Sequence, residues 1–313
     1  MKKRLITGAI FLSILLPLVI INTKITEILY LFLTMFVCFY SSFEVMRAGD
    51  NHNKLSNDGG NLKILKILIP IFSSIIAFST VISTVKFCTL GLSALHYYLF
   101  NLFTYIISAF IILCALVVIP NTTIKDYGTC LIALTYGGLF MSYAFSIRYL
   151  TPININEKLI NLNGTNCFLF VYTIIVITDS FAMLFGCKFG KHRLAPTISP
   201  KKSVEGAIAG LAGGMIFGIL GAFLYRIVSF NSNHLLLIIL ITALGSIVIS
   251  AAGQFGDLIE SKIKRCFEIK DMGNILPGHG GILDRFDSLL FSGLIFYIII
   301  FAVELSLVNW WQG

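Results

Sequence analysis

Long apolar runs separated by short polar segments make up most of the chain. A helix that crosses the hydrocarbon core of a bilayer, about 30 Å thick, needs roughly 20 consecutive apolar residues. Windows that approach or reach this length predict membrane-spanning helices near residues 5–22, 26–43, 64–84, 96–119, 128–148, 166–187, 204–228, 234–256 and 288–311. We therefore predict an all-α fold, a polytopic membrane helical bundle of about nine transmembrane helices.

The polar segments between these runs indicate how the chain is oriented. Lysine and arginine concentrate in residues 188–203 and 256–287, and such residues collect in the cytoplasmic loops of membrane proteins. A cytoplasmic N-terminus followed by nine crossings places both segments on the cytoplasmic side, so we predict that orientation. The polar segment 44–63, rich in asparagine and glycine, is predicted to be a flexible connection.

Composition narrows the class of protein further. Hydrophobic residues make up 57% of the chain and charged residues only 12%, whereas soluble domains carry roughly a quarter charged residues. Cytoplasmic loops account for the net charge of +8, and no interleaved basic and aromatic motif indicates nucleic-acid binding. The seven cysteines are scattered without a Cys-x-x-Cys pair, which argues against a disulfide framework and against a zinc site.

We divide the chain into an N-terminal region of lipid-facing helices, residues 1–160, and a catalytic region, residues 161–313, which contains both basic segments. Glycines within residues 206–221 recur mostly at spacings of three and four. This spacing marks a face where helices pack closely. The face lies either inside one protomer or between two, so a homodimer is one alternative.

Three polar groups lie at or near the predicted cytoplasmic side. The first is Asp179, inside the predicted span 166–187 and roughly 12 Å from its cytoplasmic end at 1.5 Å per residue. A carboxylate at that depth is costly unless it is paired, coordinated or hydrated. Asp179 is therefore either part of a functional site or a hydrogen-bonded residue that ties helices together.

The second group is the segment ISPKKSVEG, residues 198–206. Ser203 and Glu205 open the next predicted helix. A helix N-terminus beside two lysines suits a phosphate, because free N–H groups and the helix dipole both favour an anion. The alternative is a basic membrane anchor with an ordinary N-cap serine. The candidate binding residues are Ser199, Lys201, Lys202, Ser203 and Glu205.

The third group runs from residue 253 to 287. If the eighth span continues as a helix, residues at spacings of three, four and seven share one face: these are Asp257, Glu260, Ser261 and Lys264. Several glycines then predict a loop that packs closely on a ligand. Asp284 and Asp287 share one face at the start of the last helix.

Oxygen ligands on two helices suggest a magnesium site. Mg²⁺ typically takes one or two carboxylates together with substrate phosphates. We predict that Asp257, Asp284 and Asp287 hold one or two ions. Basic side chains nearby would bind the remaining phosphates: Lys264, Arg265, Lys270 and Arg285.

Residues 261–287 resemble the signature of the phosphatidate cytidylyltransferase family, also called CDP-diacylglycerol synthases. The signature has the form S-x-h-K-R-x4-K-D-x-small-x2-h-P-x-H-G-G-h-x-D-R-h-D, where h is hydrophobic. Every specified position is filled, by Ser261, Ile263, Lys264, Arg265, Lys270, Asp271, Gly273, Leu276, Pro277, His279, Gly280, Gly281, Ile282, Asp284, Arg285, Phe286 and Asp287. The upstream segments GDLIES and ISPKK also resemble the family, although Ser203 stands where threonine is usual.

The resemblance implies transfer of the cytidylyl group of CTP to phosphatidic acid, which yields CDP-diacylglycerol and pyrophosphate and requires Mg²⁺. CTP, phosphatidic acid and the bilayer are the implied partners. The compact length and the lack of a transit peptide favour a bacterial-type plasma membrane, with the active site facing the cytoplasm.

Residue roles follow from the same resemblance. Lys201, Lys202, Lys264, Arg265 and Arg285 would hold phosphates, while Asp271 and His279 would either order the loop or assist proton transfer. The remaining candidates for substrate binding are Asp179, Ser199, Ser203, Glu205, Glu260, Ser261, Lys270, Gly280 and Gly281.

Two rival functions differ in class. One is a CTP-dependent transferase or kinase that acts on another lipid, such as a polyprenol. The other is a transporter that uses an intramembrane Asp179, although transporters often carry inverted repeats and broken helices in both halves.

Overall fold

The computed structural model describes residues 13–56, 62–90, 94–150, 153–155, 160–228, 235–275 and 280–310. In these residues, eight helices are long and apolar enough to cross a membrane. They cover Lys24–Asn53, Leu65–Val85, Leu99–Val118, Ile124–Tyr149, Gly164–Phe189, Val204–Leu224, Leu235–Cys266 and Leu283–Ala302. Eight of the nine predicted spans are thus confirmed, and the remaining one, 5–22, lies largely outside the described residues, although 13–20 are helical.

The surface of these helices is apolar, as contact with lipid requires. Large hydrophobic side chains point outward, including Phe110, Val118, Leu224 and Leu236, each more than 60% exposed. Soluble monomers rarely expose contiguous apolar surface on this scale. The polytopic membrane class is therefore confirmed, while the cytoplasmic placement of the N-terminus stays a prediction.

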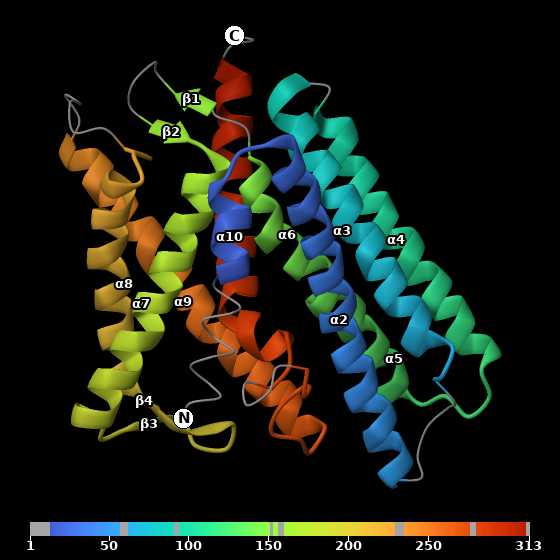
Figure 1. The fold of residues 1–313 in the computed structure, drawn as a ribbon. Helices are drawn as coiled ribbons and strands as arrows, with labels where there is room; N and C mark the ends of the chain where they lie inside the picture. The colour runs from blue at the N-terminus through green and yellow to red at the C-terminus, as the bar shows by residue number, and fades with distance from the viewer. Residues whose placement is uncertain are drawn as a thin grey trace. The chain divides into compact units, whose positions relative to one another are not determined.

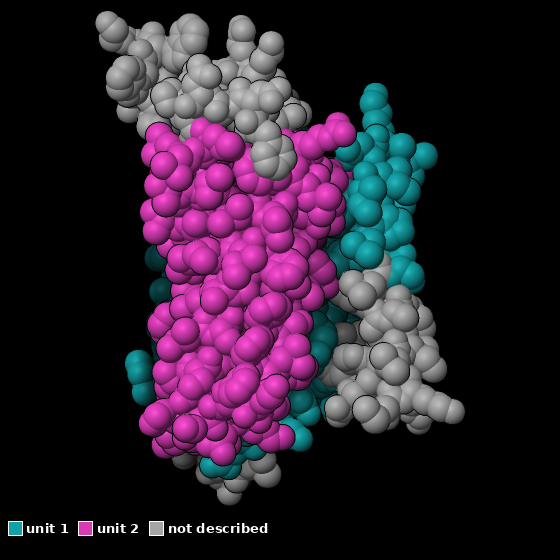
Figure 2. Space-filling view, turned by 90° about the vertical axis from the view of Figure 1, so that its left-hand side faces the viewer, with its two compact units in different colours: residues 1–146, 263–286 teal, residues 147–262, 287–313 magenta. Residues whose placement is uncertain are grey.

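The chain divides into two compact units, coloured separately in Figure 2. The first comprises residues 1–146 and 263–286, and the second comprises residues 147–262 and 287–313. The helix α9 (Leu235–Cys266) and the helix α10 (Leu283–Trp310) each contribute to both units. Residues 263–286, which belong to the predicted catalytic region, thus pack with the N-terminal helices.

In the first unit, α2 (Lys24–Ser56), α3 (Leu65–Leu90) and α4 (Ala94–Val118) follow one another side by side (Figure 1). They are followed by α5 (Ile124–Ile132), the π-helical η2 (Ala133–Phe140) and α6 (Met141–Ser146). A Cβ on Gly137 would lie only 2.7 Å from the Ser42 amide nitrogen. The absence of a side chain there lets η2 approach the backbone of α2.

The prediction that residues 44–63 form a flexible connection is wrong for residues 44–56, which continue α2. Polar side chains are stable on this part of the helix because they find partners. Lys66 Nζ lies 3.2 Å from Asp50 Oδ2, and the Asn53 amide donates a hydrogen bond to Asp126. Both carboxylates are buried, and the composition of the segment alone did not reveal these pairings.

The second unit starts with the short helix η3 (Ile147–Tyr149) and the antiparallel hairpin of β1 (Ile153–Ile155) and β2 (Ile160–Leu162). The helices α7 (Gly164–Phe189) and α8 (Val204–Leu224) lie side by side (Figure 1). A second antiparallel hairpin connects them, formed by β3 (Arg193–Ala195) and β4 (Ser199–Ser203). The two hairpins are small additions to the predicted all-α fold.

The glycine face of α8 is used inside the protomer. A Cβ on Gly210 would lie 2.9 Å from the Thr178 carbonyl oxygen of α7, and one on Gly218 would lie 2.6 Å from Ser246 Cβ of α9. Because lipid tails are as apolar as the helices, membrane helices are held together by close packing and by interhelical hydrogen bonds. One such bond, 2.7 Å long, joins the Thr178 and Ser250 hydroxyls. A homodimer stays a prediction.

We expect Gly218→Ala to destabilise the protein by roughly 1–3 kcal/mol, the usual cost of overpacking a tight contact. Gly245→Ala on α9 is the matched control, because a Cβ there meets nothing within 4 Å. Alanine is favoured over glycine in a helix by about 1 kcal/mol, so the control should melt at the same or a higher temperature in detergent. Equal melting of Gly218→Ala and the control would contradict the packing described.

Candidate active site

In the first unit, the signature segment is built around a buried ion pair between two helices. Lys264, in the last turn of α9, lies 2.9 Å from Asp284 Oδ1, in the first turn of α10. The Asp284 side chain is 2% exposed and the Lys264 side chain 12%. A pair removed from water to this extent needs further hydrogen bonds to offset the desolvation of the two charges.

The second oxygen of Asp284 receives those bonds from the loop between the helices. Asp284 Oδ2 accepts the Met272 N–H at 2.9 Å and the Gly281 N–H at 2.8 Å. Gly280 has φ of +82°, a conformation that glycine adopts without strain. A Cβ there would also lie 2.7 Å from Asp284 Oδ2. The Asp284 carboxylate is thus hydrogen-bonded to both ends of the loop.

Glu44 of α2 is a site residue that the sequence analysis missed. Its two carboxylate oxygens accept the N–H groups of Ile282 at 3.0 Å and Leu283 at 2.9 Å. Glu44 is 3% exposed. The only sequence signal is a carboxylate directly after the apolar run 26–43, at the start of the segment predicted to be a flexible connection.

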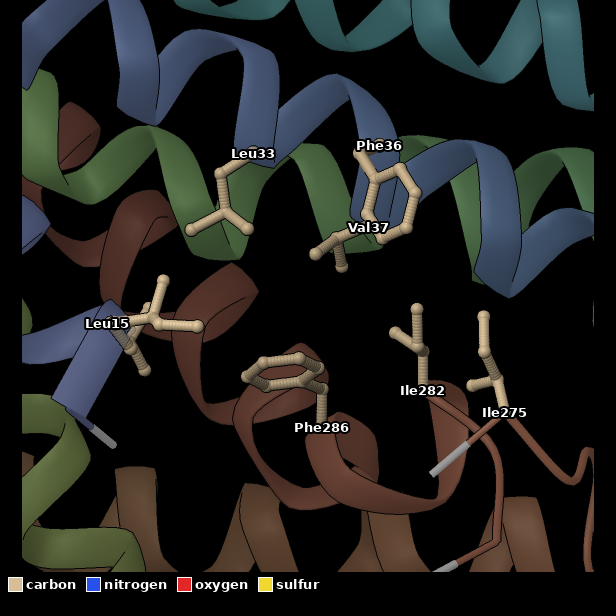
Figure 3. A pocket seen from close by; sticks show the side chains of 8 residues that line it. Leu15, Leu33, Phe36, Val37, Ile275, Ile282 and Phe286 are labelled. Atoms are coloured by element: carbon tan, nitrogen blue, oxygen red, sulfur yellow. The ribbon is translucent and has the colours of Figure 1, made fainter. Parts of the chain in front are cut away.

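The apolar side of the same segment lines a cavity in the first unit. The cavity has a volume of about 240 Å³ and is lined by Ile14, Leu15, Leu33, Phe36, Val37, Ile275, Ile282 and Phe286. Figure 3 shows Phe36 and Val37 of α2 on the opposite side of it from Ile282 and Phe286. Because no polar side chain lines it, this cavity is unsuited to a nucleotide.

In the second unit, a polar cluster gathers around Asp257 of α9. Lys202 of β4 forms an ion pair with its carboxylate, and the Ser261 hydroxyl donates a hydrogen bond to Asp257 Oδ1 at 3.3 Å. Asp179 of α7 accepts a hydrogen bond from Ser288 of α10, and Asp257 and Lys202 are the charged groups that act on it. The structure thus brings together Asp179, Lys202, Asp257 and Ser261, all of them predicted site residues.

Ser203 and Glu205 serve the fold at the start of α8. Ser203 Oγ accepts the Gly206 N–H at 3.2 Å, as an N-cap does. Glu205 Oε1 lies 2.6 Å from His192 Nδ1, and its carboxylate also accepts the backbone N–H groups of Lys191 and His192. These contacts account for the two residues structurally, and substrate binding by them stays a prediction.

The other predicted residues differ in accessibility. Lys201, Arg265, Lys270, Asp271 and Arg285 are exposed, and Ser199 is partly exposed. Glu260 is fully buried. Gly281 is buried, Gly280 is partly exposed and Asp287 is partly exposed on α10. His279 lies outside the described residues.

The oxygen donors present fit Mg²⁺ through one or two carboxylates. Asp179 and Asp257, with the Ser261 and Ser288 hydroxyls, provide hard oxygen atoms in one unit. In the parts of the chain that the structure describes, no three His, Cys, Asp or Glu side chains gather to hold a metal ion. Water and substrate phosphates would complete the shell, as is usual for Mg²⁺.

The predicted ligands belong to different units. Asp257 and Asp287 lie in the second unit, and Asp284 lies in the first. Convergence of these three residues on a shared ion stays a prediction.

Comparison with known proteins agrees with this geometry. The profile described as the cytidylyltransferase family matches residues 2–303. The chain belongs to this family. The resemblance drawn from the signature is thus confirmed, and the match extends over the N-terminal helices as well.

Curated relatives carry a more specific name. Proteins named phosphatidate cytidylyltransferase from Staphylococcus haemolyticus, Staphylococcus saprophyticus and Staphylococcus aureus (strain COL) are each 39% identical to this chain over 184 residues. The aligned part covers 58% of this chain and 63% of each relative, so the chain matches somewhat less than two thirds of their length.

We expect Lys264→Met to destabilise the protein by about 3 kcal/mol or more, because it leaves Asp284 as an uncompensated buried charge. Thermal unfolding in detergent measures the change. Adding Asp284→Asn to this variant removes the charge, and the double variant should regain part of the lost stability. A Lys264→Met protein that melts like the wild type would show that the ion pair contributes little.

Proposed function

We propose that the chain catalyses transfer of the cytidylyl group from CTP to phosphatidic acid, with CDP-diacylglycerol and pyrophosphate as products. The observation that carries this proposal is the complete signature from Ser261 to Asp287. Its charged residues Lys264 and Asp284 form a buried pair at a junction of two membrane helices. The family match and the names of the staphylococcal relatives support the same activity.

The chemistry asks this chain mainly to neutralise and position anions. The phosphate of phosphatidic acid attacks the α-phosphorus of CTP, and pyrophosphate leaves in line. A phosphate monoester has a second pKa of about 6, so the nucleophile is largely ionised at neutral pH and needs no strong base. Exposed Lys201, Arg265 and Arg285 would bind the phosphates, and electrostatic stabilisation of this kind is the main source of catalysis in phosphoryl transfer.

Mg²⁺, when bound, would supply the positive charge that offsets the developing charge on the triphosphate. Asp257, with Asp179 beside it, is the part of the described chain that best suits this role. Asp287 belongs to the same unit and would complete the proposed set of ligands.

The membrane and its sidedness belong to the same proposal. The apolar helices require a bilayer, and the relatives are bacterial. We place the protein in a bacterial plasma membrane, with residues 188–203 and 256–287 on the cytoplasmic side, where CTP is available. The concentration of lysine and arginine in these segments supports that orientation.

We expect the purified protein to form radiolabelled CDP-lipid from CTP and phosphatidic acid, and a chelator to abolish the reaction. Asp257→Asn should lower the rate at least about tenfold or raise the Mg²⁺ requirement, because an amide replaces a ligand oxygen. Thin-layer chromatography of the lipid product measures both effects. Glu268→Gln, an exposed carboxylate just beyond α9, is the control and should keep the wild-type rate.

Three results of this assay would count against the proposal. Product formed from a polyprenol and not from phosphatidic acid would favour the rival lipid transferase. Absence of CTP binding would favour the transporter. Wild-type turnover of Asp257→Asn at limiting Mg²⁺ would remove Asp257 from the metal site.

Sidedness has a separate test at Cys266, an exposed free cysteine at the end of α9. In a variant that keeps only this cysteine, we expect a membrane-impermeant maleimide to label inside-out vesicles and not right-side-out vesicles. Lys24→Cys in a cysteine-free background is the control, because residue 24 starts α2 in a predicted outer loop and should label with the opposite sidedness. Labelling of Cys266 from outside would overturn the proposed orientation.

A further inference from the structure

Glu44 acts on the signature loop from a helix that is distant in sequence. It lies on α2, and the groups that donate to it, the N–H groups of Ile282 and Leu283, lie 238 and 239 residues away along the chain. These residues start α10, where a helix leaves N–H groups without intrahelical partners and carries a partial positive charge. A carboxylate accepts these N–H groups and offsets the positive charge. Glu44, from a different helix, therefore caps the start of α10.

The position of the Glu44 carboxylate explains two glycines of the signature. A Cβ on Gly281 would lie 2.5 Å from each Glu44 oxygen, and a Cβ on Gly273 would clash with Glu44 Oε1. Neither Gly273 nor Gly281 has a positive φ, whereas Gly280 does. Gly273 and Gly281 therefore leave room for Glu44, whereas Gly280 meets a conformational demand.

Asp284 and Glu44 accept N–H groups from three consecutive residues of the backbone. The Gly281 N–H donates to Asp284, and the next two N–H groups donate to Glu44. Glu44 thus fixes the backbone of the two residues that immediately precede Asp284. The direction in which Asp284 points at Lys264 depends on that backbone.

We propose that Glu44 is a positioning residue of the active site: it holds the start of α10 so that Asp284 and the adjoining signature residues keep their catalytic geometry. The proposal rests on the proposed cytidylyl transfer for its effect on activity. Its effect on the loop can be measured without any substrate. Glu44 is not part of the signature, because it lies in the N-terminal half of the chain.

The first experiment compares Glu44→Gln with Asp50→Asn in the full-length protein. Glutamine keeps the size of the side chain, but its NH₂ group would face one of the two N–H donors. Asp50 is a second buried carboxylate on α2 and pairs with Lys66 of α3, so it controls for the loss of a buried charge on the same helix. We expect hydrogen exchange of the amides at 282–283 to rise at least tenfold in Glu44→Gln and to stay unchanged in Asp50→Asn.

The same two variants are compared in the CTP and phosphatidic acid assay. We expect Glu44→Gln to lower kcat by roughly tenfold or more, the scale seen when a supporting hydrogen bond behind a catalytic group is lost. KM for CTP should change by less than about threefold, because both Glu44 oxygens accept backbone N–H groups and a positioning residue makes no contact with CTP. Asp50→Asn should keep kcat near the wild-type value.

A double-mutant cycle tests the steric half of the proposal. Gly281→Ala should lower the melting temperature by about 5 °C in the wild type, because its methyl group overlaps the Glu44 carboxylate. In a Glu44→Ala background that space is open, so the same change should cost less than half as much. Gly280→Ala is the matched control: its cost comes from a φ of +82° and from the close approach of its Cβ to Asp284. Neither involves Glu44, so the cost should be the same in both backgrounds.

The outcomes separate the two proposals. An inactive wild type would overturn the cytidylyl transfer, while hydrogen exchange and the double-mutant cycle would still decide the role of Glu44. If the wild type is active, a Glu44→Gln variant with normal kcat and unchanged hydrogen exchange would overturn the positioning role. Equal costs of Gly281→Ala in both backgrounds would overturn the steric account of the glycine.

Discussion

The start of α10 depends on two buried carboxylates, which accept backbone N–H groups from the first residues of the helix and from the loop before it. Glu44 accepts from Ile282 and Leu283, and Asp284 accepts from Met272 and Gly281. Away from water, an N–H left without an acceptor costs about 1–3 kcal/mol. A loop rich in glycine has little side-chain packing to offset such losses, so it keeps one conformation only where acceptors are provided. The described parts of the signature loop, up to residue 275 and from residue 280, are therefore shaped by hydrogen bonding more than by packing.

This constraint links the two ends of the chain. Glu44 belongs to an N-terminal helix, whereas the loop that it holds carries the family signature. Phe145 of α6 packs edge-on against Phe286 with ring centroids 4.9 Å apart, so apolar contacts reinforce the polar ones within the first unit. The N-terminal helices, which sequence reasoning treated as lipid-facing, thus also support the loop.

Hydropathy predicted the helices well, because span length and apolarity follow directly from the thickness of a bilayer. Helical spacing also predicted that Asp257 and Ser261 share a face, and a hydrogen bond now joins them. Contacts between distant segments could not be predicted in this way. The sequence shows that Glu44 follows an apolar run, but it does not show which distant loop donates hydrogen bonds to it. For the same reason, the sequence did not show the partners of Asp50 and Asn53. Residues 44–56 were therefore predicted to be a flexible connection although they are helical.

A common charge arrangement in the two units bears on how anionic substrates would enter. Lys264 is held by Asp284 in the first unit, and Lys202 is held by Asp257 in the second. A lysine whose charge is balanced by a carboxylate attracts a phosphate less strongly than a free one, because the phosphate must displace that partner. A divalent cation that binds the carboxylate would release the lysine toward the phosphate and would also neutralise part of the triphosphate. In the proposed reaction, the metal and the lysines would therefore act together, and the pairing of these side chains would be one reason for the proposed requirement for Mg²⁺.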